Sequence, residues 1–163
     1  MKAAIFDVDG TLLDSMEIWE DVGERSLRNI GIEPEEGLGQ KLFAMTIDEG
    51  VAYVKKEYAL DEPEEILKNA MLEEVAHFYE EEAPLKAGAR ELLSRLKEAK
   101  VPMIVATSSD KCLIKAAFER LGILDYFKSI YTCDDVGAGK DQPDIYYACA
   151  KELGLEPSEI LVF

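Results

Sequence analysis

The N-terminal segment reads Ile5-Phe6-Asp7-Val8-Asp9-Gly10-Thr11-Leu12, so that an apolar run meets two aspartates and a glycine. Residues 3–6 have the composition of a short buried strand, which would put Asp7 at its C-terminal end, where open α/β sheets bind ligands. Asp7 and Asp9 would share one face of an extended strand, and Gly10 would allow a sharp turn beside them. Two crowded carboxylates favour a hard divalent cation such as Mg²⁺, which would also screen the charge of an incoming phosphate. The segment therefore predicts a phosphate-handling site with a nucleophilic aspartate, although an acidic turn has the same local composition.

The C-terminal half of the chain alternates between helical and strand-like segments. Strand-like apolar runs cover residues 101–106, 129–132 and 160–163, and helical patterns cover 87–99, 111–121 and 143–153. This alternation is typical of parallel βαβ units. The predicted fold class is therefore α/β, with a doubly wound, Rossmann-like parallel sheet.

Residues 15–83 differ from the rest of the chain because only helical periodicity is evident in them. Apolar side chains recur at helical spacing over 15–30, 46–58 and 63–79, and more weakly over 34–43. We therefore expect a discontinuous α/β core, residues 1–14 and 84–163, interrupted by a helical insertion at 15–83.

Two further motifs follow predicted strands. The first is Met103-Ile104-Val105-Ala106-Thr107-Ser108-Ser109, and the second is Gly139-Lys140-Asp141-Gln142-Pro143-Asp144. Hydroxyl residues ahead of a helix commonly cap it, and the free amides of the same helix terminus also bind phosphate. Lys140 considered alone would be an ordinary surface lysine.

The three motifs, in this order, resemble those of the haloacid dehalogenase superfamily, and the run DVDGTLLDS at 7–15 is similar to its β-phosphoglucomutase-like phosphatase branch. The helical insertion resembles the cap that this branch places after the nucleophile loop. The chain ends at 160–163, before the acidic fourth motif that completes the Mg²⁺ site in the family. The resemblance therefore implies a C-terminally truncated chain with weakened metal affinity.

The resemblance also implies a role for each matching residue. Asp7 would be the nucleophile that forms an aspartyl-phosphate, and Asp9 would be the general acid and base. Both residues would hold Mg²⁺, Asp9 through its backbone carbonyl oxygen. Lys140 would pair with Asp7 and the phosphate. The phosphate-binding residues would be Gly10, Thr107, Ser108 and Lys140.

These roles predict a Mg²⁺-dependent phosphatase of a small phosphorylated metabolite. Asp9 favours this activity over dehalogenation, because ester cleavage needs an acid for the leaving group. A β-phosphoglucomutase-like sugar phosphomutase shares every motif, and the missing fourth motif leaves a catalytically impaired remnant as a further alternative. A signalling receiver domain fits less well, because its phospho-acceptor lies on a middle strand and it has no long helical insertion.

Composition limits the partners. The 34 acidic residues against 18 lysines and arginines give a net charge of −16, which argues against nucleic acid and anionic membranes. Three cysteines without CxxC spacing predict reduced thiols in the cytoplasm. We expect neither a signal peptide nor a membrane-spanning segment, since the first apolar stretch of the sequence ends at Asp7.

Overall fold

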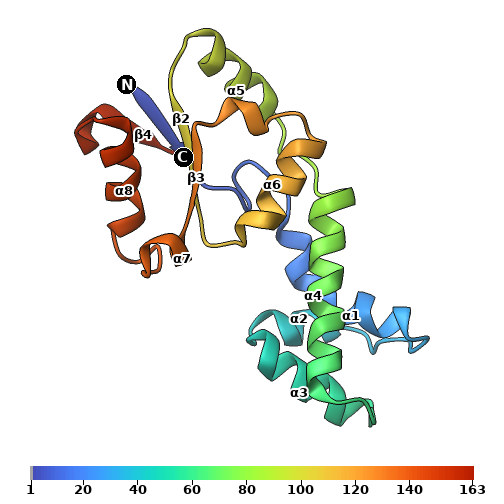
Figure 1. Cartoon of the computed structure of the whole chain (residues 1–163). Coiled ribbons are helices and arrows are strands. Elements are labelled where there is room, and N and C mark those ends of the chain that lie inside the picture. Colours follow the sequence, from blue (N-terminus) through green and yellow to red (C-terminus); the bar gives the residue numbers. More distant parts are fainter. Residues whose placement is uncertain (1) are drawn as a thin grey trace. The chain divides into compact units, whose positions relative to one another are not determined.

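The structure of the protein is a computed structural model that describes residues 2–163. The chain divides into two compact units. The α/β unit contains the residues up to Asp14 together with Tyr79–Phe163, and the helical unit contains Ser15–Phe78. Figure 1 shows strands and helices in the first unit and helices in the second.

The second boundary between the units lies before Tyr79, earlier than the expected position at 83/84. The Tyr79 side chain is completely buried in the α/β unit. The Arg120 guanidinium donates hydrogen bonds to the carbonyl oxygens of Tyr79 and Ala83, at 3.2 and 2.7 Å. These contacts attach residues 79–83 to the α/β unit.

The α/β unit is built on one parallel sheet with the strand order β3-β2-β1-β4. Its strands are β1 (Ala3–Phe6), β2 (Met103–Thr107), β3 (Ser129–Thr132) and β4 (Ile160–Val162). Both inner strands are fully buried, as expected when helices cover a parallel sheet. The predicted α/β class with a parallel sheet is confirmed.

Helices of the α/β unit alternate with these strands. They are α5 (Ala89–Glu98), α6 (Lys111–Arg120), α7 (Cys133–Val136) and α8 (Asp144–Leu153). Short 3₁₀ turns cover Leu124–Tyr126 and Pro157–Glu159, and a π-helical turn covers Phe78–Glu82. The sequence patterns predicted α5, α6, α8 and a turn before the last strand, but not α7 or the π-helical turn.

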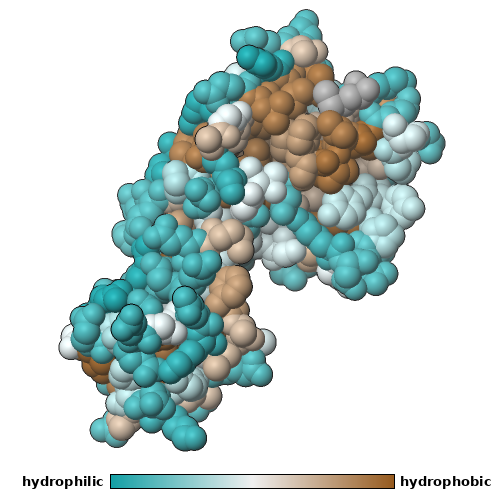
Figure 2. All heavy atoms as spheres, turned by 180° about the vertical axis from the view of Figure 1, so that it is seen from behind, coloured by the Kyte–Doolittle hydropathy of each residue, from teal (hydrophilic) through white to brown (hydrophobic). Residues whose placement is uncertain are grey.

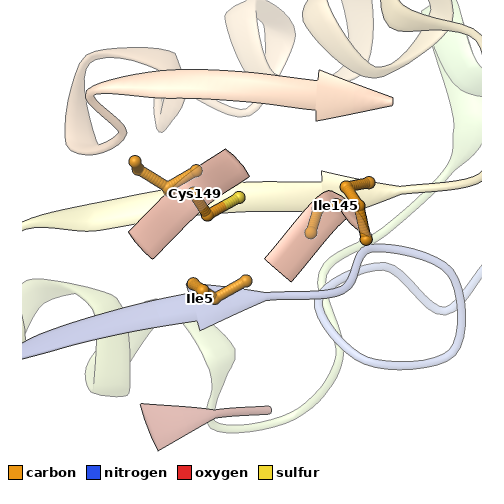
Figure 3. Packing of buried hydrophobic residues seen from close by; sticks show 5 residues of the cluster. Ile5, Ile145 and Cys149 are labelled. Carbon is orange, nitrogen blue, oxygen red and sulfur yellow. The ribbon is translucent and has the colours of Figure 1, made fainter. Parts of the chain in front are cut away.

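Successive side chains of β1 pack on opposite faces of the sheet, as strand geometry requires. On one face, Ile5 belongs to a buried cluster with Ile145 and Cys149 of α8, and Figure 3 shows the three side chains directed toward one another. On the other face, the Phe6 ring contacts Phe127 edge-on at 6.1 Å between centroids. Helices therefore enclose the sheet from both sides and fix β1 at its centre.

Strand β4 forms an edge of the sheet and leaves apolar side chains at the surface. Leu161 and Val162 are 45% and 48% exposed, and Tyr147 of the neighbouring helix α8 is 60% exposed. A hydrophobic area is visible on the α/β unit in Figure 2. Such an unpaired edge is a ready template for another strand.

The helical unit consists of α1 (Met16–Asn29), α2 (Leu38–Phe43), α3 (Ile47–Glu57) and α4 (Glu64–His77). Helix α3 begins with a capping box, in which the Thr46 hydroxyl accepts from the Glu49 amide and the Glu49 carboxylate accepts from the Thr46 amide. All described residues of Ser15–Phe78 lie outside strands. The helical character predicted for this segment is confirmed.

Two glycines let α1 and α2 approach closely. A Cβ added to Gly39 of α2 would lie 2.0 Å from the backbone oxygen of Glu20, and one added to Gly23 of α1 would lie 2.2 Å from Leu42 Cδ1. The Gly39 amide also donates a 3.1 Å hydrogen bond to Glu24 of α1. This helix pair therefore depends on the absence of a side chain at residue 39.

We expect Gly39→Ala to destabilise the helical unit by about 1–3 kcal/mol, because backbone atoms of Glu20 cannot move aside cheaply. Gly50→Ala is the matched control, since its new methyl group would meet only Leu42 Cδ2, at 3.6 Å. It should be neutral or stabilise α3 by about 0.5–1 kcal/mol through helix propensity. Urea unfolding followed by the fluorescence of Trp19 measures both effects, and equal midpoints for the two variants would contradict the tight α1–α2 contact.

The described residues 2–163 contain no helix that is both long enough and apolar enough to cross a membrane.

Cys112, Cys133 and Cys149 are free thiols. Burial raises the pKa of the Cys149 thiol to about 12, so this thiol stays protonated at neutral pH.

Candidate active site

The candidate site lies at the C-terminal ends of β1 and β2. These strands are parallel neighbours with Phe6 opposite Val105, so the residues that follow them emerge at the same edge of the sheet. Asp7 directly follows β1, and its amide donates a 3.1 Å hydrogen bond to the carbonyl oxygen of Phe163. The backbone of Asp7 is thus held from the β4 side of the sheet.

Lys140 and Asp7 meet in this site. The Lys140 ammonium group donates to Asp7 Oδ1 and forms an ion pair with it. The Lys140 side chain is 21% exposed and that of Asp7 is 37% exposed, so the pair is shielded but still open to solvent. Asp7 Oδ1 also accepts from the Val8 amide at 2.7 Å. The pairing of these two residues is the contact that the sequence motifs predicted.

The loop after Asp7 is closed by its own backbone. The carbonyl oxygen of Val8 accepts hydrogen bonds from the amides of Thr11, Leu12 and Leu13, and the Gly10 amide donates to the Leu13 carbonyl oxygen at 2.9 Å. Gly10 has a φ of +74°, a conformation that other residues adopt only with strain. The tight turn expected at Gly10 is therefore present.

Asp9 is held by two hydroxyl groups from distant parts of the chain. The Ser109 hydroxyl donates to Asp9 Oδ2 and the Tyr79 hydroxyl donates to Asp9 Oδ1, each at 2.5 Å. Neither residue was predicted to belong to the site. Ser109 follows the predicted Thr107-Ser108 pair, which is a usable signal, whereas Tyr79 has no local signal because only the folded chain brings it to Asp9.

The loop after β2 places hydroxyl and amide groups at the same edge. Thr107 is fully buried, and its hydroxyl accepts a 3.0 Å hydrogen bond from the Ser109 amide. The cap of α6 is Asp110, which accepts from the Cys112 amide at 2.6 Å. Thr107 and Ser108 therefore do not cap α6, although capping was one interpretation of their position.

A second ion pair, between Asp135 and Lys111, lies on the β3 side of the site. Asp135 caps α7 by accepting from the Thr132 amide at 2.8 Å and pairs with Lys111 at 2.6 Å. The hydrogen bond from Lys111, together with that from Thr132, lowers the pKa of the Asp135 carboxyl. The hydroxyl of Ser108 lies 3.4 Å from Cys133 Sγ, at the start of the same helix.

The predicted metal ligands are two acids. Within residues 2–163 no cluster of three or more histidine, cysteine, aspartate or glutamate side chains is arranged to hold a metal ion. The Asp7 carboxylate and the Asp9 backbone carbonyl nevertheless suit Mg²⁺, which keeps several waters and binds proteins through one or two carboxylates together with substrate phosphate. A closed structural zinc site would need four ligands, which these two acids do not supply.

Comparison with known proteins gives consistent matches over the whole chain. A family model described as haloacid dehalogenase-like hydrolase matches residues 1–163. A phosphorylated carbohydrates phosphatase from Thermotoga maritima is 28% identical, with 100% of this chain and 76% of the relative covered. Validoxylamine A 7'-phosphate phosphatase from Streptomyces hygroscopicus subsp. limoneus is 29% identical, with 99% and 76% covered.

Solved structures agree with these matches. The crystal structure of a proposed β-phosphoglucomutase from Thermotoga maritima superposes with a TM-score of 0.91 at 26% identity. The alignment covers 100% of this chain and 76% of that one. The sequence motifs and the three-dimensional fold therefore lead to the same group of proteins.

Proposed function

Because the chain belongs to the haloacid dehalogenase-like hydrolases, we propose that it is a Mg²⁺-dependent phosphatase of small phosphorylated carbohydrates that acts through an aspartyl-phosphate on Asp7. The names of its relatives support the substrate class, since two of them are phosphatases of phosphorylated carbohydrates and of validoxylamine A 7'-phosphate. The observation that carries the proposal is the Lys140–Asp7 ion pair at the C-terminal end of β1. We further propose that the helical unit serves as the cap over this site.

The first half of the reaction forms a bond from an Asp7 carboxylate oxygen to phosphorus and breaks the bond from phosphorus to the ester oxygen. Lys140 already faces Asp7 and would lower the repulsion between its carboxylate and the phosphate. Ser108 would bind a phosphoryl oxygen through its backbone amide and Thr107 through its hydroxyl. The Gly10 amide, which was also expected to bind phosphate, already donates to the Leu13 carbonyl oxygen, so Gly10 would contribute by shaping the turn beside Asp7. Mg²⁺ held by Asp7 and Asp9 would supply further charge stabilisation of the phosphoryl group.

Asp9 would give a proton to the leaving oxygen and then take one from the water that hydrolyses the aspartyl-phosphate, which restores Asp7 and releases inorganic phosphate. This cycle requires Asp9 in both its protonated and ionised forms. A hydroxyl group can donate or accept a hydrogen bond, so Tyr79 and Ser109 can stay bonded to either form. The contacts of Asp9 therefore support its proposed double role.

The expected result is phosphate release from p-nitrophenyl phosphate and from hexose and hexitol phosphates in the presence of Mg²⁺, with loss of release when EDTA removes the metal. Equal release with Mg²⁺ and with EDTA would contradict the metal dependence. No release from any ester under either condition would favour the alternative of a catalytically impaired chain.

A sugar phosphomutase is the second candidate, and the similarity to the proposed β-phosphoglucomutase structure favours it. Incubation with glucose 1-phosphate separates the two activities. A mutase would accumulate glucose 6-phosphate, whereas a phosphatase would release inorganic phosphate without isomerisation.

The free thiols and the net charge of −16 support our further proposal of a cytoplasmic enzyme whose partner is a small molecule.

A further inference from the structure

The helical unit contains a cavity of about 280 Å³ that the proposed chemistry does not use. Helices α1, α2, α3 and α4 all contribute to its wall. The rim is partly open, since Met16 is 40% exposed and Phe43 is 51% exposed. Its lining consists of Met16, Trp19, Val22, Leu42, Phe43, Met45, Thr46, Ile47, Gly50 and Met71.

The lining offers no charged side chain, and its polar side-chain groups are the Thr46 hydroxyl and the single indole N–H of Trp19. The Thr46 hydroxyl is already engaged, because it accepts from the Glu49 amide at 3.3 Å and donates to Glu49 Oε2 at 2.9 Å. A carbohydrate entering this cavity would lose water around all its hydroxyl groups and could gain at most the one hydrogen bond of the Trp19 indole N–H, and an anion would lose still more. The cavity therefore selects for an uncharged, apolar group.

The side chains of the lining favour a flat ring. Three of the five methionines of the chain lie here, beside Trp19 and Phe43. Thioether sulfur makes favourable contacts with aromatic edges, and aromatic rings pair with one another in stacked or edge-on arrangements. An apolar cavity of about 150 Å³ is known to bind benzene, so this one has room for more than one small ring. We propose that the cavity binds an uncharged aromatic group of one or two rings.

Gly50 supports this proposal independently. It occupies a buried position inside α3, where glycine costs about 0.5–1 kcal/mol relative to alanine. No close contact requires the glycine, because an added Cβ would meet only Leu42 Cδ2, at an ordinary 3.6 Å. Glycine at this position leaves the cavity wider and lowers the stability of the helix. Functional sites often show such a loss of stability in favour of function.

Binding can be measured directly, because Trp19 is the single tryptophan of the chain and lies in the cavity wall. Titration with prodan, a neutral dye built on a single two-ring naphthalene, should give saturable energy transfer from Trp19 to the dye, with one dye bound per chain. Met45→Glu would put a charge into the lining and should weaken binding by about tenfold or more. Gly50→Ala should fold at least as well as the wild type and weaken binding by about threefold, because its methyl group takes space from the ring.

Ala44→Glu is the matched control, since Ala44 is exposed, lies next to Met45 and is absent from the lining. It changes the net charge equally and should bind the dye as the wild type does. Circular dichroism checks that each variant is folded. Absence of energy transfer in the wild type, or equal affinities of Met45→Glu, Gly50→Ala and Ala44→Glu, would overturn the proposal.

The aromatic group could belong to the phosphate ester or to a separate effector, and steady-state kinetics distinguish these sources. This comparison rests on the proposed phosphatase activity, whereas dye binding does not. If the group is part of the substrate, Met45→Glu raises KM for 1-naphthyl phosphate and leaves that for glucose 6-phosphate unchanged. If it is an effector, neutral 1-naphthol alters kcat for glucose 6-phosphate. If the dye binds but neither the KM change nor the kcat change is seen, the cavity has no role in hydrolysis. If no ester is hydrolysed at all, the proposed phosphatase function is refuted, and dye binding still tests the cavity.

Discussion

Asp7→Asn should reduce phosphate release by at least about 10³-fold, because a carboxamide cannot attack phosphorus as a carboxylate does. The substitution keeps the size of the side chain and removes the charge that pairs with Lys140. Binding of the substrate should persist, since the cation that faces the phosphate remains. Initial rates with Mg²⁺ and a saturating ester give kcat, and trapping of phosphate on the protein by acid quench should succeed only in the wild type.

Asp14→Asn is the control for this experiment. It removes the same charge from the same N-terminal segment, but Asp14 is 63% exposed and pairs with Lys86 at 3.6 Å. Its kcat should stay within about twofold of the wild type, as expected for an exposed ion pair. Comparable rates for Asp7→Asn and Asp14→Asn would disprove the assignment of Asp7 as the nucleophile.

Lys140→Met should lower kcat by about 10²–10³-fold while leaving the fold intact. Methionine retains the length of the side chain and loses the positive charge that would stabilise the transferring phosphoryl group. With Lys140 gone, the phosphate would approach an uncompensated Asp7 carboxylate, so KM should rise as well. Phosphate release over a range of ester concentrations separates the two parameters.

Lys115→Met removes a lysine that is exposed on α6 and serves as the matched control. Partial recovery of kcat in Lys140→Arg would show that the charge at this position is what matters. A full rate in Lys140→Met would mean that the ion pair with Asp7 only supports the fold.

Much of the α/β unit was predictable because its signals are local. The strands at 3–6 and 129–132 are short segments with strand-like composition, and their observed bounds match the expected ones. Helix α7 was missed because Cys133-Asp134-Asp135-Val136 has the composition of a loop. A usable signal was nevertheless present, since Thr132 and Asp135 have the spacing of a capping box and form one.

The candidate site was predictable only where motifs exist. The pairing of Asp7 with Lys140 was implied by the resemblance of two motifs to those of the haloacid dehalogenase superfamily, one directly after β1 and the other beyond β3 and α7. The hydrogen bond from the Tyr79 hydroxyl to Asp9 could not be predicted. In the sequence, Tyr79 only continues the apolar periodicity of a helix. Tertiary packing alone brings its hydroxyl close to Asp9. The π-helical turn over Phe78–Glu82 could not be predicted either, because π-helical turns have no sequence pattern comparable to the 3.6-residue periodicity of α-helices.

The central position of β1 has a consequence for how the protein is made. β1 is synthesised before both of its partners, because β2 and β4 begin only at Met103 and Ile160. At translation rates of about 5–20 residues per second, the nascent β1 waits on the order of 5–20 s before any of β2 exists. During that interval an apolar strand has no sheet to join, whereas the helices that follow it can form from local contacts. We therefore expect a chaperone that covers β1 during this interval to raise the yield of folded protein.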